Sequence, residues 1–333
     1  MRKILWLIML VPIALVGAWF AWAEVLDRGF SAWLDQRRGE GWVAEARVIE
    51  TTGFPVRFRT RAVGLDLADP ETGLSLVMPG LTLESESFSP NDIAATFPEN
   101  FVVATPIEQI EVTASRFEAS LAVDPGPALG LRRADLLLED IKLDSSLRWT
   151  SSLASATLRA ERAVDDELVQ SVTFTAADFV PSAPLRRTLD PAGVFPETIE
   201  QLAVDAVIGF DTAWDRRAIE VSRPQIRTLD LTALDAVWGD ARLEAAGALT
   251  VDEEGVPDGT ITVRATNWRE IFAVLRNARL VPDGFAPAIE SVLESLAGLS
   301  GRPETLDAPL RFSNGLISFG PIPLGPAPRI VIR

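Results

Sequence analysis

The chain of 333 residues contains no cysteine, no histidine and no tyrosine. Without cysteine there is no disulfide framework, no thiol nucleophile and no thiolate metal site. Without histidine there is no Ser-His-Asp triad, no HExxH zinc site and no imidazole general base. The sequence also lacks the motifs GxGxxG, GxxxxGKS/T and GxSxG. These absences predict no catalytic residue of the common types, no metal site and no bound cofactor.

Basic residues are few relative to acidic ones, 31 against 47, and the formal net charge is −16. Nucleic-acid binding needs a basic surface, so this balance excludes DNA and RNA as partners. It also argues against a soluble domain that lies flat on an anionic leaflet. The apolar fraction of 47% and the charged fraction of 23% are typical of a globular protein.

The N-terminus carries a long uncharged apolar run, Ile4–Ala23, preceded by Arg2 and Lys3. A helix of this length rises about 30 Å, which matches the hydrocarbon layer of a bilayer. The two basic residues place the N-terminus in the cytoplasm, and Trp19 and Trp22 fall near the far headgroup zone. The run therefore predicts a single membrane anchor with the rest of the chain outside the cytoplasm.

A cleaved signal peptide is the alternative, because Ala21–Ala23 fits the small-x-small cleavage pattern. Against cleavage, the apolar run exceeds the usual h-region of about 7–15 residues. Leu26, Phe30, Trp33 and Leu34 also continue the helical spacing of one apolar face. We expect a retained anchor, and both interpretations export the remainder.

Three segments follow from this interpretation. Residues 1–23 form the cytoplasmic tip and the transmembrane anchor, and residues 24–40 form a juxtamembrane helix. Residues 41–333 form an exported β-rich domain. A stretch with four prolines, Pro181–Pro196, is the best candidate for a subdivision.

Beyond residue 41 the hydrophobic period changes to that of strands. The clearest run, Ala241–Val251, alternates apolar residues with Arg242 and Glu244. An acidic glycine turn then leads into Ile261 and Val263. Such alternation with one solvated face is typical of antiparallel sheet, and it recurs along most of the chain. The predicted fold is mainly β (α+β), with an N-terminal transmembrane helix and a few packed helices.

Local signals predict three helices within the β-rich part. Asn267–Glu270 resembles a capping box ahead of one helix, and Pro287 suits the first turn of another. Ser89–Asp92 is the start of a short third helix. Near the C-terminus, Asn314-Gly315 predicts a hairpin turn, and the proline-rich stretch Gly320–Arg329 predicts an edge strand or extended cover.

Charged clusters are the remaining candidates for chemistry. Asp165–Glu167 and Asp252–Glu254 each gather three acids where a turn is expected, so solvated turns are the favoured interpretation over metal binding or acid/base catalysis. Arg57, Arg59 and Arg61 share one strand face. That row is either a solvated face or a contact for a lipid phosphate or carboxylate.

Two motifs, Gly53-Phe-Pro-Val-Arg57 with the following Phe58 and Gly320-Pro-Ile-Pro-Leu-Gly-Pro-Ala-Pro328, resemble those of a family of membrane-anchored alphaproteobacterial proteins. That family is known only as a domain of unknown function, so it implies no catalytic residue. Trp238–Leu275 is similar in style to AsmA-like envelope proteins. This second resemblance implies a long curved sheet with an apolar groove and an outer-membrane lipid role. From the N-terminal apolar run we expect a single-pass protein of the bacterial inner membrane, with the domain after the anchor in the periplasm.

We therefore expect a non-enzymatic envelope protein that binds or guides lipid, or that scaffolds envelope partners. The alternative is a carboxylate-dependent hydrolase that acts on envelope glycan. An apolar sheet face must be covered by helices or by a ligand. The residues expected to line the groove are Leu137, Ile141, Leu143, Val204, Ile208, Leu243, Leu249, Ile261 and Val263.

Overall fold

A computed structural model describes residues 2–279, 281, 284, 286–299, 303–319 and 322–332, with side chains from residue 16 onward except 18, 219, 296, 299, 322 and 323. The chain divides into two compact units. Unit 1 comprises Met1–Ala122 and Ile141–Arg148, and unit 2 comprises Val123–Asp140 and Trp149–Arg333. Antiparallel sheet dominates both units, which confirms the mainly β prediction.

Unit 1 combines the long helix α1 (Arg2–Gly39) with antiparallel strands. β1 pairs with β2, β2 with β3, and β3 with both β4 and β5. β6 joins β5 to the end of β8 (Leu131–Ser145), a strand shared between the two units, and β7 pairs with β4. The strands are β1 (Val43–Thr52), β2 (Arg57–Asp69), β3 (Leu74–Glu86), β4 (Ser89–Thr96), β5 (Asn100–Ala104), β6 (Gln109–Thr113) and β7 (Arg116–Val123).

α1 packs one apolar stripe against the sheet of unit 1. Leu26, Phe30 and Leu34 contact sheet residues, and Leu34 is only 1% exposed against a fully buried Ala44. Trp33, the other predicted member of the stripe, is 39% exposed. Burial of this stripe explains why the helix continues through the predicted juxtamembrane segment.

The predicted anchor Ile4–Ala23 lies within α1. The side chains of residues 4–15 and 18 fall outside the described ones. In the part of the chain that is described, no helix is both long and apolar enough to cross a membrane.

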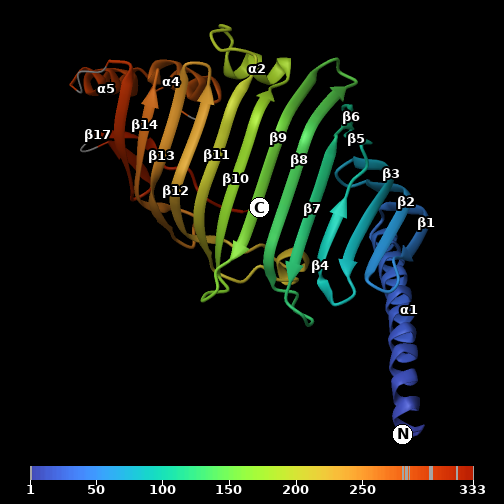
Figure 1. Cartoon of the computed structure of the whole chain (residues 1–333). Coiled ribbons are helices and arrows are strands. Elements are labelled where there is room, and N and C mark those ends of the chain that lie inside the picture. The colour runs from blue at the N-terminus through green and yellow to red at the C-terminus, as the bar shows by residue number, and fades with distance from the viewer. Residues whose placement is uncertain are drawn as a thin grey trace. The chain divides into compact units, whose positions relative to one another are not determined.

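Unit 2 is a meander in which each strand from β9 to β17 pairs with the next one in sequence (Figure 1). Its helices α2, α4 and α5 gather at one end of these strands, where the Asn277 amide donates to the Leu189 carbonyl at 3.0 Å. The elements are β9 (Thr150–Arg162), β10 (Val169–Val180), α2 (Ala183–Leu189), β11 (Ile199–Phe210), α3 (Arg217–Glu220), β12 (Ile226–Trp238), β13 (Ala241–Val251), β14 (Pro257–Thr266), α4 (Trp268–Asn277), α5 (Ala286–Leu299), β15 (Thr305–Ser313), β16 (Leu316–Phe319) and β17 (Ile322–Pro326).

Several local predictions are confirmed by the structure. α4 and α5 lie where the sequence places two helices. Asn314 and Gly315, with φ of 53° and 72°, turn β15 into β16, as an Asn-Gly hairpin requires. β17 pairs with β16 as an extended strand, although residues 320 and 321 of the proline-rich stretch lie outside the described residues.

Two local predictions are wrong. Ser89–Asp92 begins β4 rather than a helix, because pairing with β3 and β7 outweighs the weak local helix signal. The capping box is also absent, since Asn267 adopts a left-handed conformation with φ of 52° and makes no side-chain cap bond. Its amide donates to the Asp240 carbonyl at 2.9 Å instead.

The proline-rich stretch Pro181–Pro196 contains α2 and lies inside unit 2. The two units instead meet in sequence at Ala122/Val123, Asp140/Ile141 and Arg148/Trp149. Sequence composition gives no sign of these positions, because strands rather than linkers run through or up to them.

Candidate functional site

Apolar residues form continuous rows across the sheet of unit 2. Alternation puts every second side chain of a strand on one face, and the strand registers align these side chains. One row from β9 to β15 contains Leu158, Phe174, Val204, Leu234, Ala245, Val263 and Ala308. The adjacent row contains Ala156, Ala176, Leu202, Ala236, Leu243, Ala265 and Leu306. We call this surface the apolar face of unit 2.

The opposite face of the same sheet is polar. Arg242 donates to both carboxylate oxygens of Asp235 at 2.9 Å, and Arg264 pairs with Asp307 at 3.2 Å. These ion pairs are largely exposed, so their main role is to keep this face solvated. The two faces thus differ as the alternation in the sequence predicts.

Helices α4 and α5 cover the apolar face at its β13–β15 end. Trp268, Phe272 and Leu293 are buried there in one core cluster with sheet residues. The indole N–H of the buried Trp268 has a hydrogen-bond partner, because Nε1 donates to the Pro303 carbonyl at 3.0 Å. Between these helices and the sheet lies a cavity of about 260 Å³, bordered on the sheet side by Leu243 and Val263. This volume approaches the lower end of typical ligand cavities, about 300 Å³.

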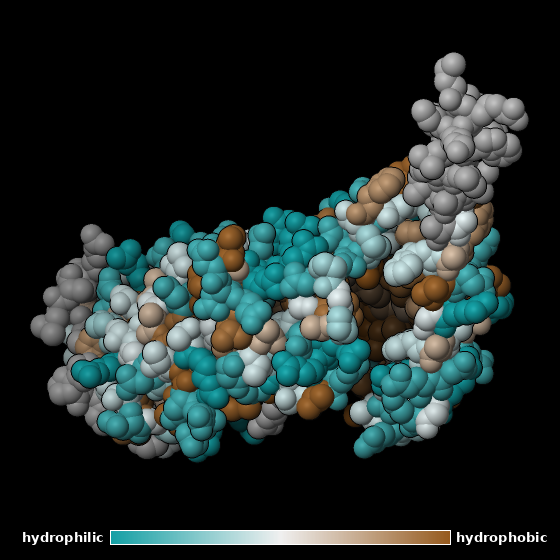
Figure 2. Space-filling model, turned by 90° about the horizontal axis from the view of Figure 1, so that it is seen from below, coloured by the Kyte–Doolittle hydropathy of each residue, from teal (hydrophilic) through white to brown (hydrophobic). Residues whose placement is uncertain are grey.

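Towards β9, the apolar face is less covered. Leu202 is 36% exposed, and Phe174, Val204 and Leu234 are only half-buried. Figure 2 shows that hydrophilic residues dominate the visible surface of the molecule and that hydrophobic residues form small groups between them. The partial exposure of these aligned side chains leaves apolar surface of unit 2 open to solvent.

A polar residue stands at the end of the apolar face. Gln170 is aligned with Arg162 and Ile208 and is 3% exposed, yet neither its amide nitrogen nor its amide oxygen has a hydrogen-bond partner among the described residues. Arg162 contacts both carboxylate oxygens of Asp124, at 2.5 and 3.0 Å. The hydrogen bond from Arg162 holds the pKa of the Asp124 carboxyl below its ordinary value.

The predicted groove residues separate between the two units. Leu243 and Val263 border the cavity, whereas Leu137 lies on β8 in the part of that strand that belongs to unit 2. Ile141 and Leu143 belong to unit 1, where Leu143 packs against the cluster under α1. The remaining four share the apolar face of unit 2 through their registers, namely Val204, Ile208, Leu249 and Ile261.

Sequence reasoning missed the contribution of β10 to the apolar face. Val172 and Phe174 alternate with threonine and serine, and they align with Ala206 and Val204. The same kind of alternation that indicated β13 was present in this segment. It also places Gln170 on the apolar side, a position at which a polar residue is unexpected.

The three predicted anion-contact residues share one face of β2, as expected for alternating positions. Arg57 pairs with Glu84 at 3.5 Å, and Arg59 donates to the same carboxylate. Arg61 is aligned with Glu50 and has no ion pair among the described residues. Glu84 thus partly neutralises this arginine row, which weakens it as a phosphate site.

Both acidic clusters lie in turns, as the favoured interpretation predicted. Asp166 accepts the backbone N–H of Leu168 at 2.9 Å. Asp252 accepts the N–H groups of Glu254 and Val256 at 3.0 and 2.8 Å. In the described part of the chain, no group of three acidic residues is arranged to hold a metal ion.

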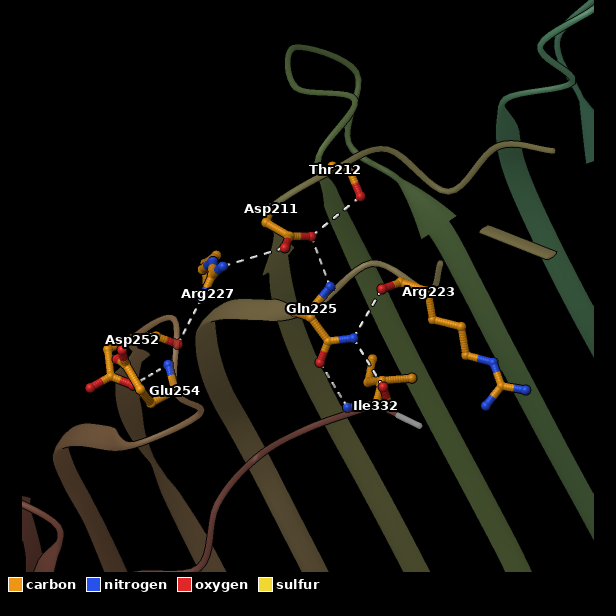
Figure 3. A network of polar contacts seen from close by, with 8 residues as sticks. All are labelled: Asp211, Thr212, Arg223, Gln225, Arg227, Asp252, Glu254 and Ile332. Atoms are coloured by element: carbon orange, nitrogen blue, oxygen red, sulfur yellow. Dashed lines mark hydrogen bonds and ion pairs between the residues drawn. The ribbon is translucent and has the colours of Figure 1, made fainter. Parts of the chain in front are cut away.

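A polar network fastens the C-terminal residues to the ends of neighbouring strands (Figure 3). The Gln225 amide donates to the Ile332 carbonyl at 2.9 Å, and the Ile332 N–H donates back at 3.0 Å. Asp211 accepts the Gln225 N–H at 2.8 Å and pairs with Arg227, which also donates to the Asp252 carbonyl at 2.6 Å. These groups are saturated by one another, so the network is structural.

Unit 1 contains a larger and more polar recess of about 660 Å³. Its lining includes Glu45 and Asp66, which are direct neighbours on β1 and β2, together with Glu111. Arg47 also lines it and has no ion pair among the described residues. The recess therefore gathers carboxylates around one arginine without fixing an ion pair.

Comparison with curated proteins and with solved structures finds no match. The sequence model of a bacterial family, described as an uncharacterized protein conserved in bacteria (DUF2125), matches residues 19–328. The match begins at Trp19 in α1 and extends beyond β17, so it spans both units. The chain belongs to the DUF2125 family of bacterial proteins.

Proposed function

We propose that this protein is an envelope protein, anchored in the inner membrane by residues 4–23, that binds the acyl chain of a lipid on the apolar face of unit 2. The observation that carries this proposal is the continuity of the apolar rows from half-exposed β9–β12 into the cavity under α4 and α5. A linear apolar ligand fits such a face better than a compact one, because the rows are long and the cavity is small.

Energetics support an acyl chain as the ligand. Burial of one methylene contributes about 0.8 kcal/mol, so eight methylenes contribute roughly 6 kcal/mol before the cost of ordering the chain. The strand spacing of about 4.8 Å gives roughly 19 Å from β10 to β14, a length that an extended long acyl chain spans. Gln170, at the β10 end, offers an unpaired donor and acceptor to a neutral polar group.

The predicted anchor supports this proposal, because it would hold the protein next to membrane lipid. The apolar run Ile4–Ala23 after Arg2 and Lys3 supports a single-pass helix with the sheet units on the periplasmic side. A protein held there has membrane lipid within reach of its exported part. The net charge of −16 supports no nucleic-acid partner. Lipid and other envelope proteins are the partners that we propose.

The experiment is native mass spectrometry and lipid extraction of the full-length protein purified in detergent. We expect co-purified lipid with wild type and its loss in Val263→Trp, whose indole fills the cavity. Thr262→Trp is the matched control, because Thr262 is adjacent on β14 but exposed on the opposite face. Leu243→Trp repeats the test at a second half-buried position if Val263→Trp does not fold. Lipid-free wild type, or equal lipid in the folded variants and control, would overturn the proposal.

Carboxylate chemistry on envelope glycan is the second candidate, favoured by the recess of unit 1. Glu45 and Asp66 face each other across two strands, at a separation of about 5 Å between Cβ atoms. Purified full-length protein would then release reducing ends from cell-wall glycan, and Glu45→Gln or Asp66→Asn would abolish the release. A wild-type protein that releases none removes this candidate.

A further inference from the structure

One rim of unit 1 exposes large apolar side chains on two adjacent turns. Phe54 and Val56, in the β1–β2 turn, are 45% and 57% exposed. Phe88, in the β3–β4 turn, is 86% exposed. The two turns are joined by the Ser87 N–H, which donates to the Val56 carbonyl at 2.9 Å. We call this edge the apolar rim of unit 1.

The apolar rim is fixed to α1 beside the predicted anchor. The Trp19 ring stacks on Phe58 at 5.2 Å and meets Phe54 edge-on at 5.3 Å, while Phe20 stacks on Phe54 at 5.5 Å. Phe20 and Trp22 remain 57% and 47% exposed on the helix. The GFPVR motif therefore serves to pack the β1–β2 turn against α1 at the level where the apolar run of the sequence ends.

The opposite rim of unit 1 has a different character. Its β2–β3 turn carries Asp69 and Glu71, and the Asp69 carboxylate accepts the Thr72 hydroxyl at 2.7 Å. This hydrogen bond lowers the pKa of Asp69, so the group is ionised at neutral pH. β2 is 13 residues long, which separates the two rims by roughly 43 Å. The rim of unit 1 beside the anchor thus exposes an aromatic cluster, whereas the opposite rim carries acidic side chains beside the exposed Leu74 and Ile107.

We infer that the apolar rim of unit 1 inserts into the interfacial zone of the bilayer that holds α1. Aromatic and aliphatic side chains at the end of a membrane helix favour this zone, where their apolar bodies leave water. The patch continues the exposed surface of Phe20 and Trp22, which fits a bilayer edge as its occupant. The inference rests on the proposed anchor but not on lipid binding by unit 2.

Insertion also reconciles an acidic protein with a position at the membrane. An anionic leaflet repels a protein with a net charge of −16, and the acidic rim adds to this repulsion. The turns of the apolar rim, residues 53–56 and 87–88, contain no acid. Arg57 and Arg59 follow directly, and Glu84 accompanies them. Glu86 borders the second turn and is aligned with Arg57, so we expect contact at the two uncharged turns themselves.

The absence of cysteine allows a clean labelling experiment. Single cysteines replace Val56 and Phe88 at the apolar rim, and Glu71 and Ile107 at the opposite rim, in the full-length protein. Ile107 is a matched control, because it is apolar and 79% exposed. It follows the end of β5, which pairs with the start of β3 and so lies at the opposite rim. Each variant carries an environment-sensitive fluorophore and is reconstituted into phosphatidylethanolamine–phosphatidylglycerol vesicles with chain-brominated lipid. Ile13→Cys, in the apolar run, reports on the anchor itself.

We expect labels at 56 and 88 to be quenched severalfold more strongly than labels at 71 and 107. Quenching at 13 without quenching at 56 and 88 leaves the anchor intact and overturns this inference. Absence of quenching at 13 overturns the anchor and the inference together. Labels at 56 and 88 that are shielded equally in detergent and in vesicles, without quenching, would indicate a protein partner on the rim and would also overturn it.

Discussion

The two units cover their sheets with helices in different ways. In unit 1, α1 closes tightly over its strands, and Leu34, Leu65 and Met78 are at most 3% exposed beneath it. In unit 2, Trp268 at the start of α4 is equally buried, yet a cavity remains and the apolar face continues past the helices. A closed interface suits permanent attachment of a helix to a sheet. An apolar face that extends beyond the helices that cover it suits reversible binding of a ligand.

Truncation of Trp268, the largest buried side chain of α4, is the strongest test of this comparison. Trp268→Ala should lower the free energy of unfolding by about 3–5 kcal/mol, because it enlarges the existing cavity and removes one of the two hydrogen bonds that the Pro303 carbonyl accepts. Chemical denaturation of the full-length protein in detergent, followed by far-UV circular dichroism, measures the loss. Thr262→Ala, exposed on the polar face, should change it by less than about 0.5 kcal/mol. A cost near that of the control would mean that α4 is not part of the core.

A paired substitution sharpens the contrast between closed and open apolar positions. Leu34→Ala should cost about 2–4 kcal/mol, since the site under α1 is fully packed. Leu202→Ala, on the open part of the apolar face, should cost less than about 1 kcal/mol, because the side chain is partly solvated. Leu202→Ala should nevertheless reduce the amount of co-purified lipid. Equal stability losses for the two variants would show that the apolar face is as closed as the α1 interface.

The sequence was sufficient for what depends on local pattern. Alternation located β13 and β14, and Asn314-Gly315 defined its hairpin because the left-handed turn needs those residues. The length of α1 followed from the apolar run and the stripe through Leu34. These features depend on neighbours only a few positions away, so one sequence is enough to predict them.

Features that depend on strand register could not be predicted from the sequence. Ser89–Asp92 has the local pattern of a helix start, and only its pairing with β3 and β7 makes it a strand. The rows of the apolar face depend on how strands align, including the irregularity between Leu231 and Leu234. Phe54 and Phe58 read as a motif without a partner, because their contact with Trp19 joins segments far apart in sequence.

A glycine on the apolar face offers a smaller test of how closely β13 and β14 approach. A Cβ on Gly247 would lie 2.2 Å from the Thr260 carbonyl oxygen, and its φ of 151° is one that residues with a side chain rarely adopt. Gly247→Ala should therefore cost about 1–3 kcal/mol. Ala248→Ser, adjacent and exposed, is the control and should be nearly neutral. Thermal unfolding of both variants decides, and a neutral Gly247→Ala would mean that the two strands separate easily at this point.

The ion pair at the polar end of the apolar face has the smallest expected effect. Arg162 lowers the pKa of Asp124, so the pair stabilises the folded state fully above the ordinary aspartate pKa of about 3.9. That contribution is lost as the pH falls from there through the lower pKa of the folded state. Because both side chains are partly exposed, the contribution at neutral pH should be at most about 1 kcal/mol. Unfolding free energies of wild type, Asp124→Asn, Arg162→Gln and the double variant, measured at neutral and acidic pH, isolate the coupling. A coupling that persists unchanged under acid would show that hydrogen bonds to the neutral carboxyl, rather than charge, hold this end of unit 2 together.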